Sequence, residues 1–529
     1  MGAWSLYFLA KLGLYATHAI GLHAIANLLF AAALAWPISQ LRPLLRRLRL
    51  ALALPLAVAL LYYDSYLPPW ARLVDEAGAL SNFRADYLLE LAHRFVPLAA
   101  LGALAGIGVL YFLLQHRLRF ATLAFIGLGA AVVLPAPRLA APLPDERFVR
   151  PNDPVDPEAA DVAAAPLSGA QLDAALQAYY GAQLGKTVNF ARAGAARFDL
   201  VLLSICSLAR DDLDFLGMQD AALLSRFDIV FTQFNSAATY SGPAVLRLLH
   251  GTCGQTPQAR LYSGTAADSC YLFRNLAAAG YRPALLLNHD GHFDHFADQL
   301  SSQGGIGADP LDNRAAPVAM QSFDGTPIRA DYPLLAQWWN RDAGGDGHRA
   351  LLYNTITLHD GNRVPGAAGN SRETYAPRLR QLFSDLGRFL DIIEASGRPT
   401  VVVLIPEHGA ALRGDALQVP GLRELPTRAI TRVPVAVKLI GMGTVGHGAG
   451  PLVISRPSSY LSLMALVAGL NQLAPGNTAR ESLQNLAQAL PASEWVAENA
   501  GTLLFRQGGR DYLRSPAGQW TPFGDTARP

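Results

Sequence analysis

Residues 400–409 read Thr-Val-Val-Val-Leu-Ile-Pro-Glu-His-Gly, an apolar run that ends in a carboxylate and an imidazole. A run of β-branched and aliphatic residues without polar alternation is typical of a strand buried on both faces. In open α/β sheets, ligands bind beyond the carboxyl ends of the strands. This stretch therefore predicts a central strand that delivers Glu407 and His408 to such a site.

Similar apolar runs recur through the second part of the chain, with helical stretches between them. They cover residues 198–206, 227–234, 283–287, 350–353 and 433–440. Alternating strand and helix patterns predict a doubly wound α/β sheet. A helical pattern at 169–184 precedes the first strand, so we place a single α/β domain at 168–529.

Polar residues follow several of these predicted strands. The first strand ends at Cys206, and the second leads to Ser241, which precedes Gly-Pro and an apolar helix at 244–250. One interpretation of Ser241 is an ordinary serine near a helix N-cap. The other is a nucleophile aimed at a phosphorus atom, with the N–H groups of the helix holding the phosphate. A serine nucleophile needs a base or a metal beside it.

Glu407 and His408 offer the ligands for such a metal. With Cys206 and the Ser241 oxygen they would complete a four-coordinate site of the kind that zinc prefers. Taken singly, Glu-His-Gly is more often a loop turn than a metal site, and Cys206 is more often a buried apolar cysteine than a ligand. Their joint placement at the ends of predicted strands favours one zinc ion.

Two other patterns carry weaker signals. Residues 441–446 read Gly-Met-Gly-Thr-Val-Gly, but the His-Gly-Ala-Gly-Pro that follows cannot open a helix, so we interpret this dinucleotide-like fingerprint as a loop. His289, His292 and His295 form a histidine-rich segment without a clear fourth ligand. Among them His289 is the better site candidate, since it lies directly beyond a strand, and we expect it to contribute to substrate binding.

The three cysteines suggest one pair and one thiol with another role. Cys253 and Cys270 lie close in sequence and flank a polar turn, so we expect a disulfide there if the domain is exported. In a reducing compartment both would instead be free thiols.

The hydrophobic content of 51% is concentrated in the first ~140 residues. Five apolar stretches, at about 4–21, 22–39, 50–66, 95–114 and 120–138, approach the length of a membrane span. Cationic residues follow the second stretch and the fourth, which places both loops in the cytoplasm by the positive-inside rule. We therefore expect a transmembrane domain at 1–140, a cytoplasmic N-terminus and an extracytoplasmic α/β domain. A passive anchor is the plainest role for these spans.

Residues 141–167 are rich in proline, alanine and aspartate, as in an extended spacer. The formal net charge of +2 gives no basis for nucleic-acid binding.

Several motifs together resemble the cellulose-biosynthesis phosphoethanolamine transferases of the BcsG family, within the alkaline-phosphatase-like superfamily. The matching stretches are 204–208, 234–243, 253–255, 358–362, 406–409 and 421–423. The predicted five-span anchor and the Pro-rich linker also match. The resemblance covers nearly the whole chain and is most specific over 198–460.

The resemblance implies roles for individual residues. Ser241 would be the nucleophile, and Cys206, Glu407 and His408 would hold one zinc ion with it. Tyr240, His359 and Arg423 would line the donor phosphate. In other phosphoethanolamine transferases of the superfamily, threonine, a carboxylate and Asp-His stand in place of Ser241, Cys206 and Glu-His.

The implied reaction transfers phosphoethanolamine from phosphatidylethanolamine to glucosyl hydroxyls of cellulose through a phosphoserine-type intermediate. The implied setting is the bacterial inner membrane, beside a cellulose synthase complex, with a periplasmic catalytic domain. The rival functions are transfer of phosphoethanolamine or phosphoglycerol to another acceptor such as lipid A, hydrolysis by a sulfatase or phosphatase, and a non-catalytic subunit of a polysaccharide secretion complex.

Overall fold

A computed structural model describes most of the chain as two compact units, Met1–Asp153 and Pro154–Pro529. The described residues are 2, 4–16, 20–37, 43–65, 83–95, most of 106–133, and 166–523 apart from 191–195, 265, 342–346, 416, 444–449 and 474–477. The predicted linker at 141–167 lies almost entirely outside the described residues.

The first unit is helical. Its helices are α1 (Trp4–Ala16), α2 (Ala24–Ala35), α3 (Pro43–Asp64), α5 (Ala85–Phe95) and α7 (Phe120–Val133). Four of them overlap predicted spans, whereas much of the predicted span at 95–114 lies outside the described residues. Among the described residues, no helix combines the length and the apolar character needed to cross a membrane.

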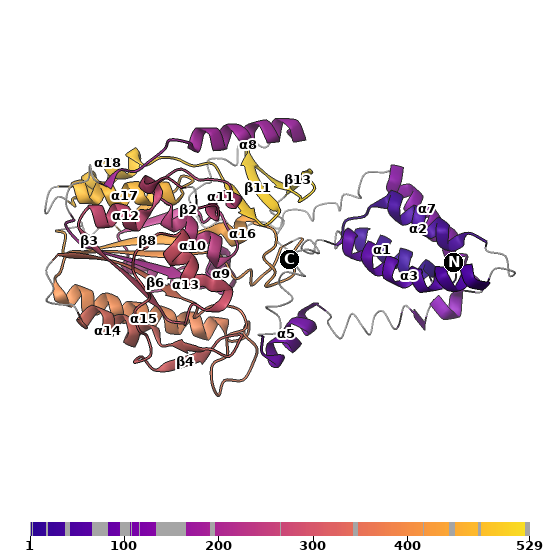
Figure 1. Cartoon of the computed structure of the whole chain (residues 1–529), viewed down its shortest axis with the longest axis horizontal. Coiled ribbons are helices and arrows are strands. Elements are labelled where there is room, and N and C mark those ends of the chain that lie inside the picture. The colour runs from indigo at the N-terminus through magenta and orange to yellow at the C-terminus, as the bar shows by residue number, and fades with distance from the viewer. Residues whose placement is uncertain are drawn as a thin grey trace. The chain divides into compact units, whose positions relative to one another are not determined.

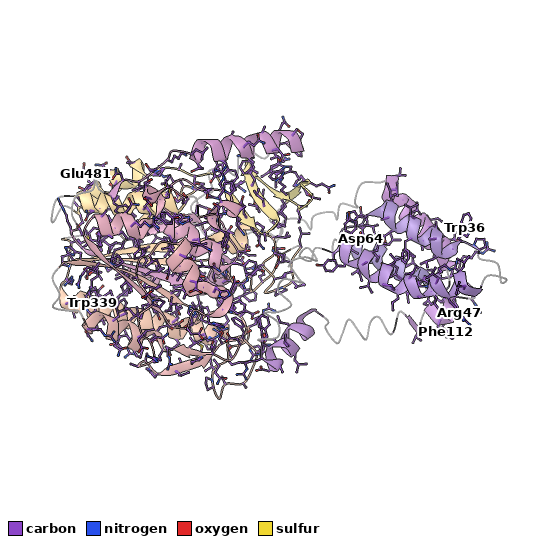
Figure 2. All side chains as sticks on the ribbon, viewed as in Figure 1. Trp36, Arg47, Asp64, Phe112, Trp339 and Glu481 are labelled. Atoms are coloured by element: carbon purple, nitrogen blue, oxygen red, sulfur yellow. A yellow bond between two sulfur atoms is a disulfide. The ribbon has the colours of Figure 1, made fainter. Side chains whose placement is uncertain are left out.

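A buried polar cluster joins three helices of this unit. The Lys11 ammonium forms an ion pair with the Asp64 carboxylate, and both side chains are almost fully buried. Asp64 also accepts hydrogen bonds from the His23 backbone N–H (2.9 Å) and the Asn27 amide (2.7 Å). Asp64 lies at the end of the helices opposite Trp36 and Arg47 (Figure 2). Lys11, which interrupts a predicted span, is thus paired inside the unit. The His23 ring is exposed, and its Nδ1 atom lies 2.8 Å from the Asp64 carboxylate; His18 lies outside the described residues.

The second unit is built on a seven-stranded sheet with the order β3-β6-β1-β7-β8-β2-β9. The strands are β1 (Asp199–Ile205), β2 (Ile229–Asn235), β3 (Tyr281–Leu287), β6 (His348–Thr355), β7 (Thr400–Pro406), β8 (Arg432–Ile440) and β9 (Leu452–Ile454). Every residue of β1 and of β7 is buried, as the unbroken apolar runs predict. The predicted doubly wound α/β sheet is confirmed. It is mixed, because β8 runs antiparallel to both of its neighbours.

Helices cover both faces of this sheet (Figure 1). One face packs on α10 (Ser241–Leu249), α12 (Leu272–Ala278), α17 (Tyr460–Gln472) and α18 (Arg480–Ala489), and the other on α14 (Asp331–Arg341) and α15 (Tyr375–Ser396). The long helix α15 ends at Gly397, whose φ of 64° gives the left-handed cap that glycine favours. The central strands therefore contribute alternate side chains to two separate apolar layers.

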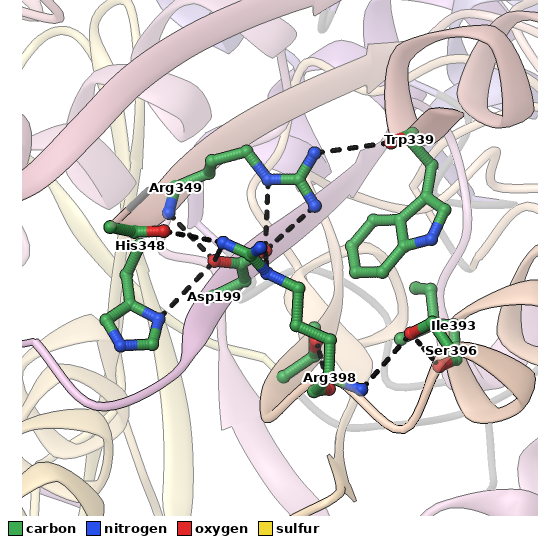
Figure 3. Close-up of polar contacts among 9 residues, drawn as sticks. Asp199, Trp339, His348, Arg349, Ile393, Ser396 and Arg398 are labelled. Atoms are coloured by element: carbon green, nitrogen blue, oxygen red, sulfur yellow. Dashed lines mark hydrogen bonds and ion pairs between the residues drawn. The ribbon is translucent and has the colours of Figure 1, made fainter. Parts of the chain in front are cut away.

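At the amino ends of its central strands, the sheet is tied by a buried ion cluster (Figure 3). The Asp199 carboxylate accepts hydrogen bonds from the guanidinium groups of Arg349 and Arg398, each at 2.8 Å. Arg349 also lies over the ring of Trp339, 4.4 Å from its centroid. Because these residues come from or next to β1, β6 and β7, the cluster fixes the register of three strands at the edge opposite their carboxyl ends.

Several smaller elements surround the main sheet. Helix α8 (Gly169–Gln183) begins at Ser168, which forms a capping box with Gln171. A hairpin of β4 (Val318–Gln321) and β5 (Pro327–Arg329) precedes α14. The chain closes with a four-stranded antiparallel sheet of β10 (Val496–Asn499), β11 (Thr502–Gln507), β12 (Arg510–Arg514) and β13 (Trp520–Phe523). The shorter helices are α9 (Arg210–Phe215), α11 (Gln258–Leu261), α13 (Phe296–Asp298) and α16 (Arg428–Thr431).

Candidate functional site

Four side chains meet at the carboxyl ends of the sheet strands. The Cys206 Sγ atom, which directly follows β1, lies 3.3 Å from the Ser241 Oγ atom. The His408 Nε2 atom, just beyond β7, lies 3.4 Å from that hydroxyl oxygen and 3.9 Å from the sulfur. Ligand atoms of Cys206, Glu407 and His408 all lie within 4.8 Å of one another, and all three residues are buried. The sequence predicted this grouping.

Backbone pairing carries the strand order into these loops. The Cys206 N–H donates to the Thr355 carbonyl (3.0 Å), and the Glu407 N–H donates to the Ile205 carbonyl (3.0 Å). The ligand-bearing loops are therefore continuations of the sheet, which fixes their backbones.

Ser241 is the first residue of α10, and Tyr240 is its N-cap. The helix therefore begins three residues earlier than the predicted 244–250. Pro243 has no N–H, and the Ala244 N–H already donates to the Tyr240 carbonyl (3.1 Å). In this first turn the amides of Ser241 and Gly242 are left to face an anion.

The loop before α10 is held by β10. The Asn235 side chain accepts from the Ala237 N–H (2.8 Å) and donates to the Val496 carbonyl (2.9 Å). Ala237 has a φ of 59°, a left-handed conformation that is rare without glycine. Docking on the C-terminal sheet stabilises this strained turn and so places Ser241.

Glu407 uses one of its oxygens within the protein. Its Oε1 atom accepts from the Ser204 hydroxyl (2.8 Å) and from the Asn354 amide. Its Oε2 atom is buried and has no hydrogen-bond partner among the described residues. Burial raises the pKa of Glu407. A buried carboxylate oxygen without a donor is unfavourable unless a cation faces it.

His408 presents one ring nitrogen to the cluster. Its Nδ1 atom lies 2.9 Å from the Gly409 carbonyl oxygen, which can only accept, so Nδ1 carries the proton. The Nε2 lone pair then faces Cys206 and Ser241. Burial lowers the pKa of His408 well below its usual range, and Arg423 adds to this effect. The neutral ring is the form that binds a metal.

Arg423 lies over the His408 ring. Its Nη1 atom is 3.0 Å from Nδ1 and 3.4 Å from Nε2 of that ring. Because the two ring nitrogens point in diverging in-plane directions, one atom so close to both contacts the ring face. The same Nη1 atom donates to the Ser207 hydroxyl (3.2 Å), and the guanidinium lies 5.2 Å from the centroid of the Tyr240 ring.

Tyr240 and His359 stand at the edge of the cluster. The Tyr240 hydroxyl donates to the Glu424 carboxylate (2.6 Å). The His359 Nδ1 atom lies 2.6 Å from the Asp360 carbonyl oxygen and therefore donates to it, and the ring contacts Phe323. Burial lowers the pKa of His359 to about 4, with a contribution from Arg423.

The histidines of the 289–295 segment separate in the structure. His289 is buried, and both of its ring nitrogens are hydrogen-bonded, to Asn354 Oδ1 (3.0 Å) and to the Gly291 N–H (3.1 Å). His292 and His295 are exposed. The glycine-rich segment that begins at Gly441 follows β8, and its first three residues form a bend, as expected for a loop. Residues 444–449 lie outside the described residues.

Several supporting residues were not singled out from the sequence. Ser204 and Asn354 hold Glu407. Asp212 accepts from the N–H groups of Ala209 and Ala410, each at 2.8 Å, and so joins the two ligand-bearing loops. Ser207 has a φ of 68°, and strain of this kind gathers at functional sites. Ser204 and Asn354 are polar residues inside otherwise apolar strands, and this pattern is the signal that could have indicated both of them.

The cysteines divide as the sequence predicts. The structure joins Cys253 and Cys270 in a disulfide and leaves Cys206 as a free, buried thiol.

The donor set fits a zinc ion. Burial raises the pKa of Cys206 to about 12, and the nearby Glu407 carboxylate adds to this effect. Without a cation, the thiolate and the carboxylate would therefore be unfavourable side by side in the interior. A thiolate, an imidazole and a single carboxylate oxygen suit zinc, whereas magnesium prefers an all-oxygen shell.

A thiol, a carboxylate and an imidazole that meet a serine hydroxyl at the carboxyl edge of a sheet define an α/β protein with a candidate metal-binding nucleophile site. Family profiles for the cellulose biosynthesis protein BcsG match both units, the N-terminal domain over residues 4–133 and the C-terminal domain over residues 157–520. The chain is 34% identical to the cellulose biosynthesis protein BcsG of Escherichia coli (strain K12), over 99% of this chain and 96% of that protein. The BcsG protein of Salmonella typhimurium (strain LT2) gives the same values. The chain belongs to the BcsG family.

Similar solved structures match part of the chain at low identity. A protein of the alkaline phosphatase superfamily from Vibrio parahaemolyticus is 15% identical, with 62% of this chain and 79% of that chain covered and a TM-score of 0.46. The lipoteichoic acid synthase LtaP from Listeria monocytogenes is 14% identical, with 65% and 88% covered and a TM-score of 0.42. The soluble domain of lipooligosaccharide phosphoethanolamine transferase A from Neisseria meningitidis is 15% identical, with 56% and 93% covered and a TM-score of 0.40.

Proposed function

We propose that this protein transfers phosphoethanolamine from phosphatidylethanolamine to glucosyl hydroxyls of cellulose, through a covalent intermediate on Ser241. The observation that carries the proposal is the contact of the Ser241 hydroxyl with Cys206 and His408, beside the free Oε2 of Glu407. Membership of a family named for cellulose biosynthesis supports the acceptor.

Cys206, Glu407 and His408 would hold one zinc ion together with the Ser241 oxygen. When bound, zinc favours the alkoxide form of the serine and offsets negative charge on the phosphoryl group. The proposed fold of the catalytic domain is alkaline-phosphatase-like, and its proposed bounds are 168–529.

In the first step, the Ser241 Oγ atom attacks phosphorus. The bond from Oγ to phosphorus forms as the bond from phosphorus to the diacylglycerol oxygen breaks, and the serine proton ends on the released diacylglycerol. In the second step, a glucosyl hydroxyl attacks the same phosphorus, the bond to Oγ breaks, and the hydroxyl proton returns to Ser241. Each step needs the negative charge on the two non-bridging oxygens of the phosphodiester to be offset.

Arg423 and the start of α10 can bind that phosphoryl group. The guanidinium is a bidentate donor for phosphate oxygens. The backbone N–H groups of Ser241 and Gly242, in the first turn of α10, can donate to the same phosphate. His359, whose Nδ1 proton is held by the Asp360 carbonyl, keeps the lone pair of Nε2, which can accept a hydrogen bond from a substrate hydroxyl. Tyr240 helps to orient Arg423, since the guanidinium lies over the face of the Tyr240 ring.

We further propose that residues 1–140 anchor the protein in the bacterial inner membrane with five spans and a cytoplasmic N-terminus. The concentration of apolar residues in the first ~140 positions supports this placement. The linker at 141–167 would then carry the catalytic domain into the periplasm, near the lipid donor and a cellulose synthase complex.

Two measurements test the proposal. Purified full-length protein incubated with phosphatidylethanolamine should release diacylglycerol and gain one phosphoethanolamine group on Ser241, detected by peptide mass spectrometry. Cellulose from cells that carry the gene should contain phosphoethanolamine, and cellulose from cells without it should not. If cells that carry the gene make unmodified cellulose but modified lipid A, then lipid A and not cellulose is the acceptor. If phosphoethanolamine is released to water alone, the protein is a hydrolase.

A further inference from the structure

Asn354 lies in a row of polar side chains that crosses four adjacent strands. It is the next-to-last residue of β6, and the register pairs it with Leu287 of β3 and with Ser204 of β1. His289 follows β3 by two residues, and Glu407 follows β7. Hydrogen bonds run along this row from His289 through Asn354 to Glu407, and every member is buried.

The direction of each hydrogen bond in the row is determined. The Gly291 backbone N–H can only donate, so the Nδ1 atom of His289 accepts from it at 3.1 Å. In a neutral ring the proton then lies on Nε2, which donates to Asn354 Oδ1 at 3.0 Å. With Oδ1 turned to His289, the Nδ2 group of Asn354 donates to Glu407 Oε1. Burial lowers the pKa of His289, which agrees with the neutral ring.

This arrangement distinguishes the two oxygens of Glu407. Asn354 and Ser204 both donate to Oε1, whereas Oε2 has no donor among the described residues. When two donors hold one oxygen of a carboxylate, the side chain is already fixed in the conformation that presents the other oxygen to a metal. If the Asn354 amide were flipped, its Oδ1 atom would face Glu407 Oε1, and two hydrogen-bond acceptors would be in contact.

We propose that His289 and Asn354 are positioning residues that fix Glu407 so that its Oε2 atom serves as a single-oxygen zinc ligand. This inference rests on the proposed function, because it takes Cys206, Glu407 and His408 as a zinc site. It gives His289 a role other than substrate binding, since both of its ring nitrogens are engaged inside the protein.

The test measures zinc affinity of the full-length protein by competition with a chelator of known affinity, with thermal unfolding of the metal-free protein as a check on folding. Asn354→Ala should weaken zinc binding by about 10–100-fold, the usual effect of removing a group that orients a ligand. His289→Ala should weaken it less, and His289→Gln should restore most of the affinity because the glutamine amide can still donate to Asn354. Ser204→Ala removes the other donor and should give an intermediate loss.

Asn288 provides a matched control. It is a buried asparagine at the same edge, but its amide donates to Thr355 (2.9 Å) and Thr357 (3.1 Å), and none of its side-chain hydrogen bonds among the described residues goes to Glu407. Asn288→Ala should therefore lower stability as Asn354→Ala does, while zinc affinity stays within about 3-fold of wild type.

The outcomes separate this inference from the proposed function. If Glu407→Ala loses zinc while Asn354→Ala, Ser204→Ala and His289→Ala bind it like the wild type, the positioning role is wrong and the metal site stands. An equal loss in Asn288→Ala would also overturn it, because the effect would then be general loosening. If the wild type and Glu407→Ala bind zinc equally, Glu407 is no ligand and the proposed centre itself is wrong.

Discussion

The Cys206 sulfur lies 3.3 Å from the Ser241 hydroxyl oxygen, although 35 positions separate the two residues in the sequence. Cys206 follows β1 and Ser241 opens α10 after β2, and β7 and β8 lie between those two strands in the sheet. The contact is therefore made by the loop from 236 to 240, which reaches back across the carboxyl edge of the sheet. It brings the Ser241 hydroxyl to the one cysteine of the three that is outside the disulfide.

Ser241→Ala should abolish the covalent intermediate and lower phosphoethanolamine transfer by more than about 1,000-fold, because it removes the hydroxyl that contacts both Cys206 and His408. The change should leave unfolding within about 1 kcal/mol of wild type, since Tyr240 rather than Ser241 is the N-cap. Peptide mass spectrometry and a lipid-release assay check it. Ser225→Ala, at an exposed serine, is the control. A labelled intermediate in Ser241→Ala protein would show that another residue is the nucleophile.

The main residues of the site could be predicted because each directly follows a strand or opens a helix. Cys206, Glu407 and His408 end apolar runs that are long enough to identify strands in a single sequence. Parallel strands bring their carboxyl ends to one edge, so three separate motifs become neighbours without any knowledge of side-chain contacts.

The supporting residues could not be predicted in the same way. Asn354 interrupts the end of an apolar run, and its partner depends on the register between β6 and β1. Asp212 lies in a short helix whose only visible signal is charge. The antiparallel direction of β8 and the C-terminal sheet were also missed, since an apolar run shows that a strand is buried but not which way it runs.

The protein should bind about one zinc ion per chain, and His408→Ala should lose both the zinc and the transfer activity. The ring supplies the imidazole nitrogen of the set, and its loss leaves a thiol and a carboxylate that burial disfavours as ions. Elemental analysis of purified protein checks the stoichiometry. His292→Ala and His295→Ala, at exposed positions, should keep both properties. Two tightly bound zinc ions, or full activity of the metal-free protein, would contradict the single-zinc site.

Replacing Cys253 and Cys270 together with alanine should lower the free energy of unfolding by about 3 kcal/mol, because the disulfide closes a short loop of the unfolded chain. Thermal unfolding with matched protein concentrations measures the change. Thiol titration of the denatured, metal-free wild type should detect one thiol, that of Cys206. Three reactive thiols would mean that the pair is reduced in the mature protein and would count against export.

His359 should make the metal-free protein less stable as the pH falls from about 6.5 to about 4. Its pKa is lowered to about 4 in the folded state, chiefly by burial, so the unfolded chain binds one more proton across that range. Unfolding then becomes easier with acid, and the full contribution is present above pH 6.5. In His359→Gln, the slope of the unfolding free energy against pH near pH 5 should be shallower by about 1 kcal/mol per unit. Equal slopes in the two proteins would show that His359 titrates normally.

Asp64→Ala should destabilise the helical N-terminal unit by about 3–5 kcal/mol, because it leaves the buried Lys11 ammonium without its counter-ion. Lys11 keeps bonds to Asn27 (2.7 Å) and the Leu60 carbonyl (3.3 Å), but neither of these carries the negative charge that its burial requires. The full-length protein is unfolded in detergent micelles, and cleavage of residues 1–140 by a protease reports the unfolding of this unit separately from the α/β unit.

The double variant Lys11→Met and Asp64→Leu decides what the ion pair does. If the pair serves only to balance charge, apolar replacement of both partners should restore most of the stability. If stability returns but lipid-dependent transfer does not, the pair has a further role at this end of the unit. This end lies opposite Arg47 (Figure 2), so under the proposed topology the positive-inside rule would turn it toward the periplasm. Asp86→Ala, which removes an exposed partner of Arg84, should change neither property. A single Asp64→Ala variant as stable as the wild type would show that the ammonium is not buried as described.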